Sequence, residues 1–282
     1  MRVCRLILAL SVVMCAMQSS ALSFEINSSR ANMLGGALAL RHPGATDFLA
    51  APGLFGADRA LSFEAGVARQ FDISDLDIGF LAFGYRHGNL QFAFGAQQLG
   101  ATDYFAEQTA QTALGYQLGN VSAGLTLSAK RFQFGSAYSS LSAGAIGFGV
   151  GLRHKQGAIH VALDNLNRPS FTGSAPSEPQ RAALYFELAG SKSYTLSAVA
   201  RFAEYSKPDF GIGQTVALTD FARLSWGISS EPLIYGAGFE IRKGRITFIY
   251  AGSIHTTLGY SQSLTLSMRL APKKKRLAKA GK

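Results

Sequence analysis

Five histidines are the side chains of this 282-residue sequence best suited to proton transfer or metal binding: His42, His87, His154, His160 and His255. A serine hydrolase also needs a serine and an orienting carboxylate or amide held beside its histidine. No local pairing of histidine with serine supports such a site, and His154 and His160 lack the spacing and companions of zinc ligands. We therefore predict that the protein is not an enzyme and uses no metal or other cofactor.

The glycine-rich stretch GAIGFGVG, residues 144–151, could suggest a nucleotide-binding loop. A phosphate-binding loop requires a tight turn followed by the N-terminus of a helix. Here the glycines recur every second or third residue inside a predicted strand, and no helical pattern follows. We interpret them as small residues that allow close approach of neighbouring backbone.

The positive charge is concentrated at the two ends of the chain. The formal net charge is +10, with 27 basic and 17 acidic residues. Arg2, Arg5 and six cations after residue 272 account for eight of the basic residues, which leaves 19 against 17 in the body. A nucleic-acid-binding domain would carry a basic stripe on a folded face. We therefore predict no nucleic-acid partner.

The first residues resemble an export signal. Arg2 and Arg5 precede an apolar run over residues 6–17, which is shorter than the ~20 residues that a spanning helix needs. The small residues at 19–21 predict cleavage after Ala21. Both cysteines, Cys4 and Cys15, lie in this predicted signal peptide (residues 1–21), so the mature chain would contain no thiol. A lipoprotein signal at Cys15 and an uncleaved membrane anchor are the alternatives.

The rest of the sequence repeats one pattern of about ten alternating residues followed by a turn signal. Such segments are typical of strands in transmembrane β-barrels. Short turns such as Gly119-Asn120 and Lys243-Gly244 separate them. The pattern predicts about 14 strands and no helix after the signal, over residues 60–70, 77–85, 90–98, 109–118, 121–131, 142–153, 158–167, 181–189, 194–204, 209–218, 221–229, 233–242, 245–254 and 261–270.

The two faces of these strands differ in composition. One face carries large apolar residues, as at Leu224, Trp226 and Ile228; the other carries mainly glycine, alanine, serine and threonine. A soluble β-sandwich is the alternative, but its outward face would carry charges freely, and only 16% of all residues are charged. Strands that span a bilayer must close into a barrel to pair every backbone group. We predict an all-β fold: a transmembrane antiparallel β-barrel over residues 59–270, in the outer membrane of a Gram-negative-type bacterium and in contact with its lipids.

Charged residues at predicted inward positions are the candidates for a functional role. They could bind the polar head of a ligand, anchor a segment inside the barrel, or form structural ion pairs, because buried charges are generally paired. These candidates are Glu64, Asp164, Glu187, Arg201, Arg223, Glu240, Arg242 and Arg269.

Three stretches carry a resemblance to a known family. SSRANMLGGALALRHPGATDFLAAPGLFG (residues 28–56), VALDNLNRP (161–169) and SIHTTLGYSQSLTLSMRL (253–270) resemble motifs of the outer-membrane long-chain fatty-acid transporter (FadL-like) superfamily, especially its PorV/PorQ-type branch. The segment around Pro52 lacks the asparagine of the family motif. The last strand ends on Leu270 rather than the usual aromatic residue.

The resemblance implies a 14-stranded barrel with an N-terminal hatch folded into the lumen. Residues 22–58 would form this hatch, with turns at Gly35, Gly36, Pro52 and Gly53; a disordered leader is the alternative. The family implication is a barrel that binds or passes small hydrophobic molecules through its lumen. The alternative function is a non-transporting component or scaffold of a secretion or cell-envelope complex.

The chain ends in a basic tail, residues 271–282, which we predict to lie in the periplasm. Its cations could bind a partner protein or anionic lipids, or the tail could be a disordered solubilising end. The residues concerned are Lys273, Lys274, Lys275 and Arg276.

Overall fold

The computed structural model describes residues 28–54, 61–101, 105–135, 139–171, 177–191 and 193–270. Its fourteen strands form a closed barrel in which each strand pairs antiparallel with its sequence neighbours, and β1 closes on β14 through the pairing of Leu61 with Leu270. The strands are β1 (Leu61–Arg69), β2 (Asp77–His87), β3 (Leu90–Ala101), β4 (Phe105–Leu118), β5 (Val121–Gln133), β6 (Leu141–Arg153), β7 (Gly157–Asp164), β8 (Arg181–Ser191), β9 (Tyr194–Ala203), β10 (Asp209–Ala217), β11 (Ala222–Ser230), β12 (Leu233–Lys243), β13 (Ile246–His255) and β14 (Gly259–Leu270).

The predicted number of strands and the closed antiparallel barrel are confirmed. Most strand ends agree with the prediction to within a few residues, but β7 ends at Asp164 rather than at 167. Asn165 adopts a left-handed conformation (φ 56°), and its side-chain Nδ2 donates to the Pro179 carbonyl at 3.0 Å. Because asparagine tolerates this conformation better than most residues, the chain leaves the sheet there.

The alternating side chains of each strand lie on opposite faces of the barrel wall. Leu125, Leu127 and Leu152 point outward and are 53–59% exposed, whereas Thr126 is 2% exposed. A broad apolar exterior of this kind is expected where a protein meets lipid. Within the described residues, no helix has the length and apolar character needed to cross a bilayer.

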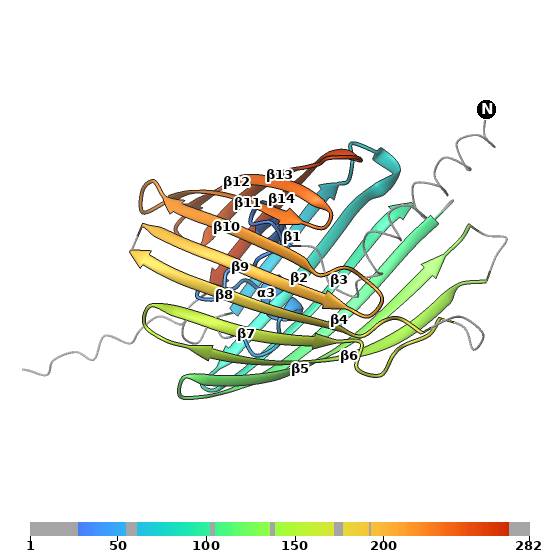
Figure 1. The fold of residues 1–282 in the computed structure, drawn as a ribbon, viewed down its shortest axis with the longest axis horizontal. Coiled ribbons are helices and arrows are strands. Elements are labelled where there is room, and N and C mark those ends of the chain that lie inside the picture. Colours follow the sequence, from blue (N-terminus) through green and yellow to red (C-terminus); the bar gives the residue numbers. More distant parts are fainter. Residues whose placement is uncertain are drawn as a thin grey trace, which may run out of the picture.

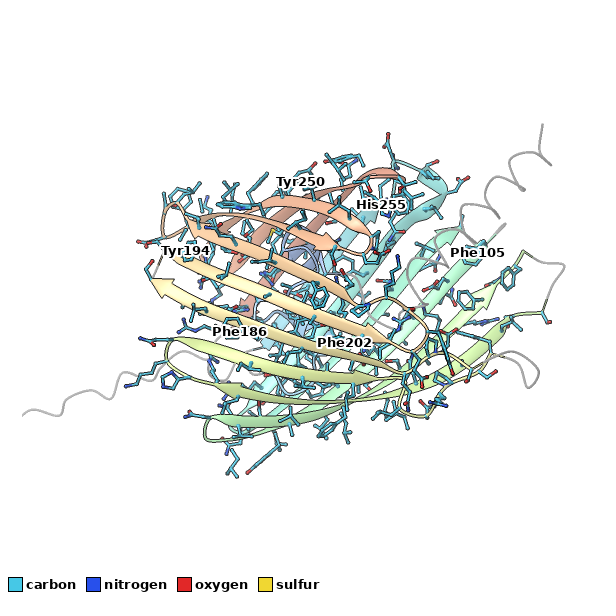
Figure 2. All side chains as sticks on the ribbon, in the orientation of Figure 1. Phe105, Phe186, Tyr194, Phe202, Tyr250 and His255 are labelled. Carbon is cyan, nitrogen blue, oxygen red and sulfur yellow. The ribbon has the colours of Figure 1, made fainter. Side chains whose placement is uncertain are left out.

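The two ends of the barrel differ in their connections. At the short-turn end, only residues 88–89 separate β2 from β3, and 119–120 separate β4 from β5. At the loop end, residues 165–180 separate β7 from β8. Figure 2 shows Tyr194 at the short-turn end, and Phe105 and His255 at the loop end. In outer-membrane barrels the short turns face the periplasm.

Residues 28–54, which we call the lumen segment, lie inside the barrel (Figure 1, blue). The segment contains two short helices, α2 (Ser29–Met33) and α3 (Ala45–Ala50). Outside the segment, a short 3-10 helix, η1 (Ser74–Leu76), lies between β1 and β2. The expectation of no helix after the signal is therefore wrong. Turns this short carry too few residues to show a helical repeat, and packing against the wall stabilises them.

The lumen segment supplies much of the buried core. Met33, Leu34, Phe48 and Leu49 are at most 2% exposed and pack with wall alanines such as Ala82. Most of residues 28–54 are buried, as a packed hatch segment would be. Residues 1–27 lie outside the described residues, so the predicted signal peptide and its cleavage after Ala21 stay predictions, as do the hatch limits at 22 and 58.

Candidate functional site

A cluster of four charged residues joins the lumen segment to two strands far apart in the sequence. Arg30 of α2 donates from Nε to Glu240 Oε1 of β12 at 2.9 Å, and from Nη1 to Glu64 Oε1 of β1 at 3.2 Å. Asp47 of α3 lies 3.8 Å from the same guanidinium nitrogen. Arg30 and Glu64 are 8% and 1% exposed, and Asp47 is fully buried. We call these residues the Arg30 cluster.

The carboxylates of the Arg30 cluster are satisfied by further donors. Glu64 Oε2 accepts from the backbone N–H and the hydroxyl of Thr46 at 3.0 and 2.8 Å, and Oε1 accepts from Ser267 Oγ at 3.1 Å. Asp47 accepts from Ser28 Oγ at 3.2 Å and from the Gly44 N–H at 2.8 Å. Buried charges persist only when they are paired and hydrogen-bonded in this way. The cluster therefore has the features of a structural junction.

Three more predicted inward charges contact the backbone of the lumen segment. Arg269 Nη2 donates to the Pro43 carbonyl at 2.6 Å, and Arg201 Nη1 donates to the Gly36 carbonyl at 3.4 Å. Glu187 receives backbone hydrogen bonds from Leu40 and Arg41. Together with Glu64 and Glu240, these residues hold the segment from several sides of the wall.

The remaining candidates do not join this group. Asp164 lies at the loop end beside Gly147, and its strand partner is Arg181. Arg223 and Arg242 face the lumen at the short-turn end, where they line cavities below the lumen segment. Lys273, Lys274, Lys275 and Arg276 lie outside the described residues, so their role stays a prediction.

Glycines of the wall contact the backbone of the lumen segment directly. We call this group of residues the glycine bed: Gly124, Gly149, Gly211, Gly213, Gly227 and Gly236. A Cβ at Gly227 would lie 2.3 Å from the carbonyl carbon of Leu34, and one at Gly149 would lie 2.1 Å from the Pro52 carbonyl oxygen. Contacts this short leave no room for any larger residue. The interpretation of residues 144–151 as a close-approach surface is consistent with this packing.

The predicted hatch turns lie in this bed. Gly35, Gly36 and Gly53 adopt positive φ values of 64°, 83° and 100°. A Cβ at Gly35 would also lie 2.4 Å from the Ile228 carbonyl oxygen, so both conformation and space select glycine. Pro52, beside Gly53, is fully buried.

The short-turn end contains two cavities below the lumen segment. One has a volume of about 370 Å³ and the other about 140 Å³, and they share His42 and Arg223 among their lining residues. Partial burial, together with the positive charges of Arg223, Arg153, Arg269 and Arg41, lowers the pKa of His42 to about 4. His42 is therefore neutral at pH 7 in a strongly positive environment.

The loop end contains a cluster of four phenylalanines. Ring centroids lie 4.8 Å apart for Phe132 and Phe171, 5.7 Å for Phe105 and Phe134, and 6.1 Å for Phe105 and Phe132. Beneath them, Lys130 is buried and donates to Glu107 at 2.5 Å. We call these four rings the Phe132 cluster.

A depression of about 900 Å³ lies over the same half of the barrel. It is lined both by exposed residues such as Val67, Leu81 and Leu266 and by buried residues such as Phe80 and Thr109. Its lining is mostly apolar. Residues of both wall faces thus contribute to a single surface that could hold an apolar molecule.

Sequence reasoning missed the partners that the lumen segment contributes. Arg30 and Asp47 were not among the candidates, although each is an isolated charge in a run of small and apolar residues within 28–56. An isolated charge in such a run indicates a buried side chain that needs a partner, and this was the signal that could have identified both residues. Lys130 and Glu107 were also missed; they occupy inward positions of adjacent strands, with Lys130 directly opposite Thr109. Among the described residues, no group of three or more histidine, cysteine or acidic residues is placed to hold a metal ion.

A closed antiparallel barrel with an apolar belt outside and a packed, charge-linked segment inside defines an outer-membrane β-barrel protein. The solved structure of the Pseudomonas putida toluene transporter TodX is similar, with a TM-score of 0.62 over 89% of this chain and 98% of that chain at 9% identity. A deltaS2 mutant of the TodX monoaromatic hydrocarbon channel gives 0.61 over 88% and 98% at 8% identity. The Acinetobacter baumannii outer-membrane protein Omp33 gives 0.50 over 75% and 97% at 7% identity.

These matches establish the fold and agree with an outer-membrane location. No family model matches the chain, and no curated protein matches it. The match to TodX agrees, at the level of the fold, with the FadL-like resemblance, but the PorV/PorQ-type branch is not shown. Nothing in these matches supports the secretion or envelope scaffold. The matched structures are channels or outer-membrane proteins rather than enzymes.

Proposed function

We propose that this barrel binds small hydrophobic molecules at its loop end and passes them across the outer membrane. The Phe132 cluster carries the proposal, because four aromatic rings gathered at the end of a lumen provide a binding surface for an apolar solute. The adjoining depression of about 900 Å³ is large enough for such a solute. The fold shared with a toluene transporter makes a monoaromatic hydrocarbon the first solute to test.

The test is uptake of a labelled monoaromatic hydrocarbon into liposomes that contain the purified protein. Phe171→Ala removes a ring of the Phe132 cluster and should reduce the uptake rate several-fold. Phe92→Ala is the matched control, since Phe92 points outward from β3 and is 41% exposed. Uptake equal to that of protein-free vesicles would refute the proposal, and equal effects of the two variants would refute the role of the cluster.

We further propose that the lumen segment is part of a hatch, residues 22–58, whose movement admits the solute. The segment contacts both β5–β6 and β10–β12 through the glycine bed, so solute passage requires it to shift. Ser29 Oγ and Thr265 Oγ1 lie 2.7 Å apart, which suits a designed pair of cysteines. In the variant with Ser29→Cys and Thr265→Cys, oxidation should block uptake and a reductant should restore it. Uptake that is indifferent to oxidation would show that the segment stays in place.

The PorV/PorQ-type assignment rests on sequence motifs alone, and the scaffold function it implies has no contact in the structure to support it. Deletion of residues 273–282 followed by a pull-down of envelope proteins would test it directly. An unchanged set of bound proteins would show that the tail does not bind envelope partners.

A further inference from the structure

The larger cavity at the short-turn end has an unusual set of lining residues. It has a volume of about 370 Å³ and is lined by three basic side chains, Arg41, Lys155 and Arg223, together with His42. Among the residues that the structure describes, its lining contains no carboxylate. The other polar side chains of its lining are Gln156 and four hydroxyl residues, Ser191, Ser193, Thr195 and Thr215. We call this space the cation cavity.

The three cations form no close ion pair with the described residues, although Arg223 is the strand partner of Glu240. None of them has a carboxylate oxygen within 4 Å among the described residues. Nε of Arg41 is buried and has no hydrogen-bond partner. Like charges held together without counter-charges repel one another, and this repulsion is relieved when an anion binds.

Two of the three nearby carboxylates, Glu187 and Glu240, are bound to the lumen segment. Glu187 and Glu240 line the smaller neighbouring cavity, where Glu187 accepts hydrogen bonds from backbone N–H groups of the lumen segment. Glu240 accepts from Arg30 at 2.9 Å. Asp220 also lines that cavity, which contains Arg242, Arg245 and Arg269 as well. The excess of positive charge therefore extends beyond the cation cavity.

We propose that the cation cavity binds a phosphate group, held by Arg41, Lys155 and Arg223 and by surrounding hydroxyls. Guanidinium groups bind phosphate through two parallel N–H···O bonds, and lysine adds a point charge. A phosphate carries more charge and more acceptor oxygens than a single carboxylate, so it matches three cations and four hydroxyl donors better. The phosphate can belong to a free anion or to a lipid headgroup, because the cavity lies at the short-turn end of the barrel, and such ends face the periplasm in outer-membrane barrels.

The experiment measures binding of inorganic phosphate and of pyrophosphate to the full-length protein in an uncharged detergent, by isothermal titration calorimetry. Arg223→Gln and Arg41→Gln should each weaken binding about tenfold, and Lys155→Gln by a similar factor. Lys243→Gln removes a cation from the same end of the barrel but outside both cavities, so it should leave binding unchanged. Raising the NaCl concentration should weaken binding, since salt screens these partly exposed charges.

A second arm identifies the source of the phosphate. The same variants are reconstituted in nanodiscs with phosphatidylglycerol or with uncharged lipid, and bound lipid is measured by native mass spectrometry. Retention of phosphatidylglycerol that is lost in Arg223→Gln but kept in Lys243→Gln assigns the site to a lipid headgroup. Binding of the soluble anions alone assigns it to a free phosphate.

The proposal is overturned if neither arm shows binding that depends on Arg41 or Arg223, or if Lys243→Gln weakens binding equally. Heat-modifiable gel migration of each variant separates a loss of binding from a failure to fold. The site lies at the opposite end from the Phe132 cluster. The liposome uptake assay therefore tests the proposed passage of hydrophobic molecules independently of phosphate binding.

Discussion

Two groups of arginines in the same lumen illustrate opposite uses of positive charge. In the Arg30 cluster, one buried guanidinium faces three carboxylates, and those carboxylates accept further hydrogen bonds from backbone and hydroxyl groups. In the cation cavity, Arg41 and Arg223 line a space of about 370 Å³ in which no described lining residue is a carboxylate. The first group fixes the lumen segment in place, whereas the second leaves its charge available to a ligand.

The difference follows from solvation. A charge removed from water must be compensated within the protein, because the cost of desolvating it is several kcal/mol. A cation that borders a water-filled cavity keeps most of its hydration and needs no partner. Burial therefore distinguishes Arg30, which is 8% exposed and paired, from Arg223, which is exposed at the wall of the cation cavity.

The largest effect is expected at Arg30. Arg30→Met would leave Glu64 and Asp47 buried without their counter-charge, which should cost about 3–5 kcal/mol. The measurement is unfolding in detergent by heat-modifiable migration, together with protease sensitivity of the lumen segment. The control is Arg69→Met, which breaks an exposed pair with Asp77 and should change neither readout. Equal effects of the two variants would mean that the Arg30 cluster is not a structural junction.

A smaller effect is expected in the glycine bed. Gly227→Val inserts side-chain atoms where a Cβ already lies 2.3 Å from the Leu34 backbone, and such overpacking costs about 1–3 kcal/mol. Gly79→Val is the matched control, because nothing lies within 4 Å of its Cβ position. The same unfolding and proteolysis measurements apply. If Gly79→Val destabilises the protein as much, backbone contact with the lumen segment is not the reason for the glycines.

The pH dependence of stability probes the cation cavity. The pKa of His42 is about 4 in the folded protein, below its ordinary value of 6.5, so the unfolded chain takes up the proton more readily. The stability that neutral His42 provides is complete above about pH 6.5 and is lost as the pH falls toward 4. His42→Gln should lose less stability over this interval, measured as the unfolding midpoint at several pH values. Parallel curves for the two proteins would contradict this expectation.

The smallest effect on stability is expected at Arg223. Arg223→Gln removes an exposed charge that forms no hydrogen bond or ion pair with the described residues, so the free energy of unfolding should change by no more than about 0.5 kcal/mol. The informative result is the contrast with Arg30→Met under identical conditions. A large destabilisation by Arg223→Gln would show that this cation is part of the structure rather than a free binding group.

The sequence predicts the wall of this barrel well and its interior contacts poorly. Alternation in residues 233–242 assigns Phe239 to the outer face and Glu240 to the inner one, and the structure agrees because neighbouring side chains of a strand point to opposite faces. Glu64, Arg201, Glu240 and Arg269, which alternation assigns to the inner face, contact the lumen segment. The same alternation could not reveal that Arg30 meets Glu240, since 210 residues separate them.

The sequence by itself determined the number of strands, the closed antiparallel barrel and the face on which each side chain lies. These features follow from a period of two residues and from turn residues, which are local properties of the chain. Only the tertiary structure decided which charges neutralise one another and which remain open to a ligand. That outcome depends on the register around the barrel and on where the lumen segment displaces water, and neither is encoded in any short stretch of sequence.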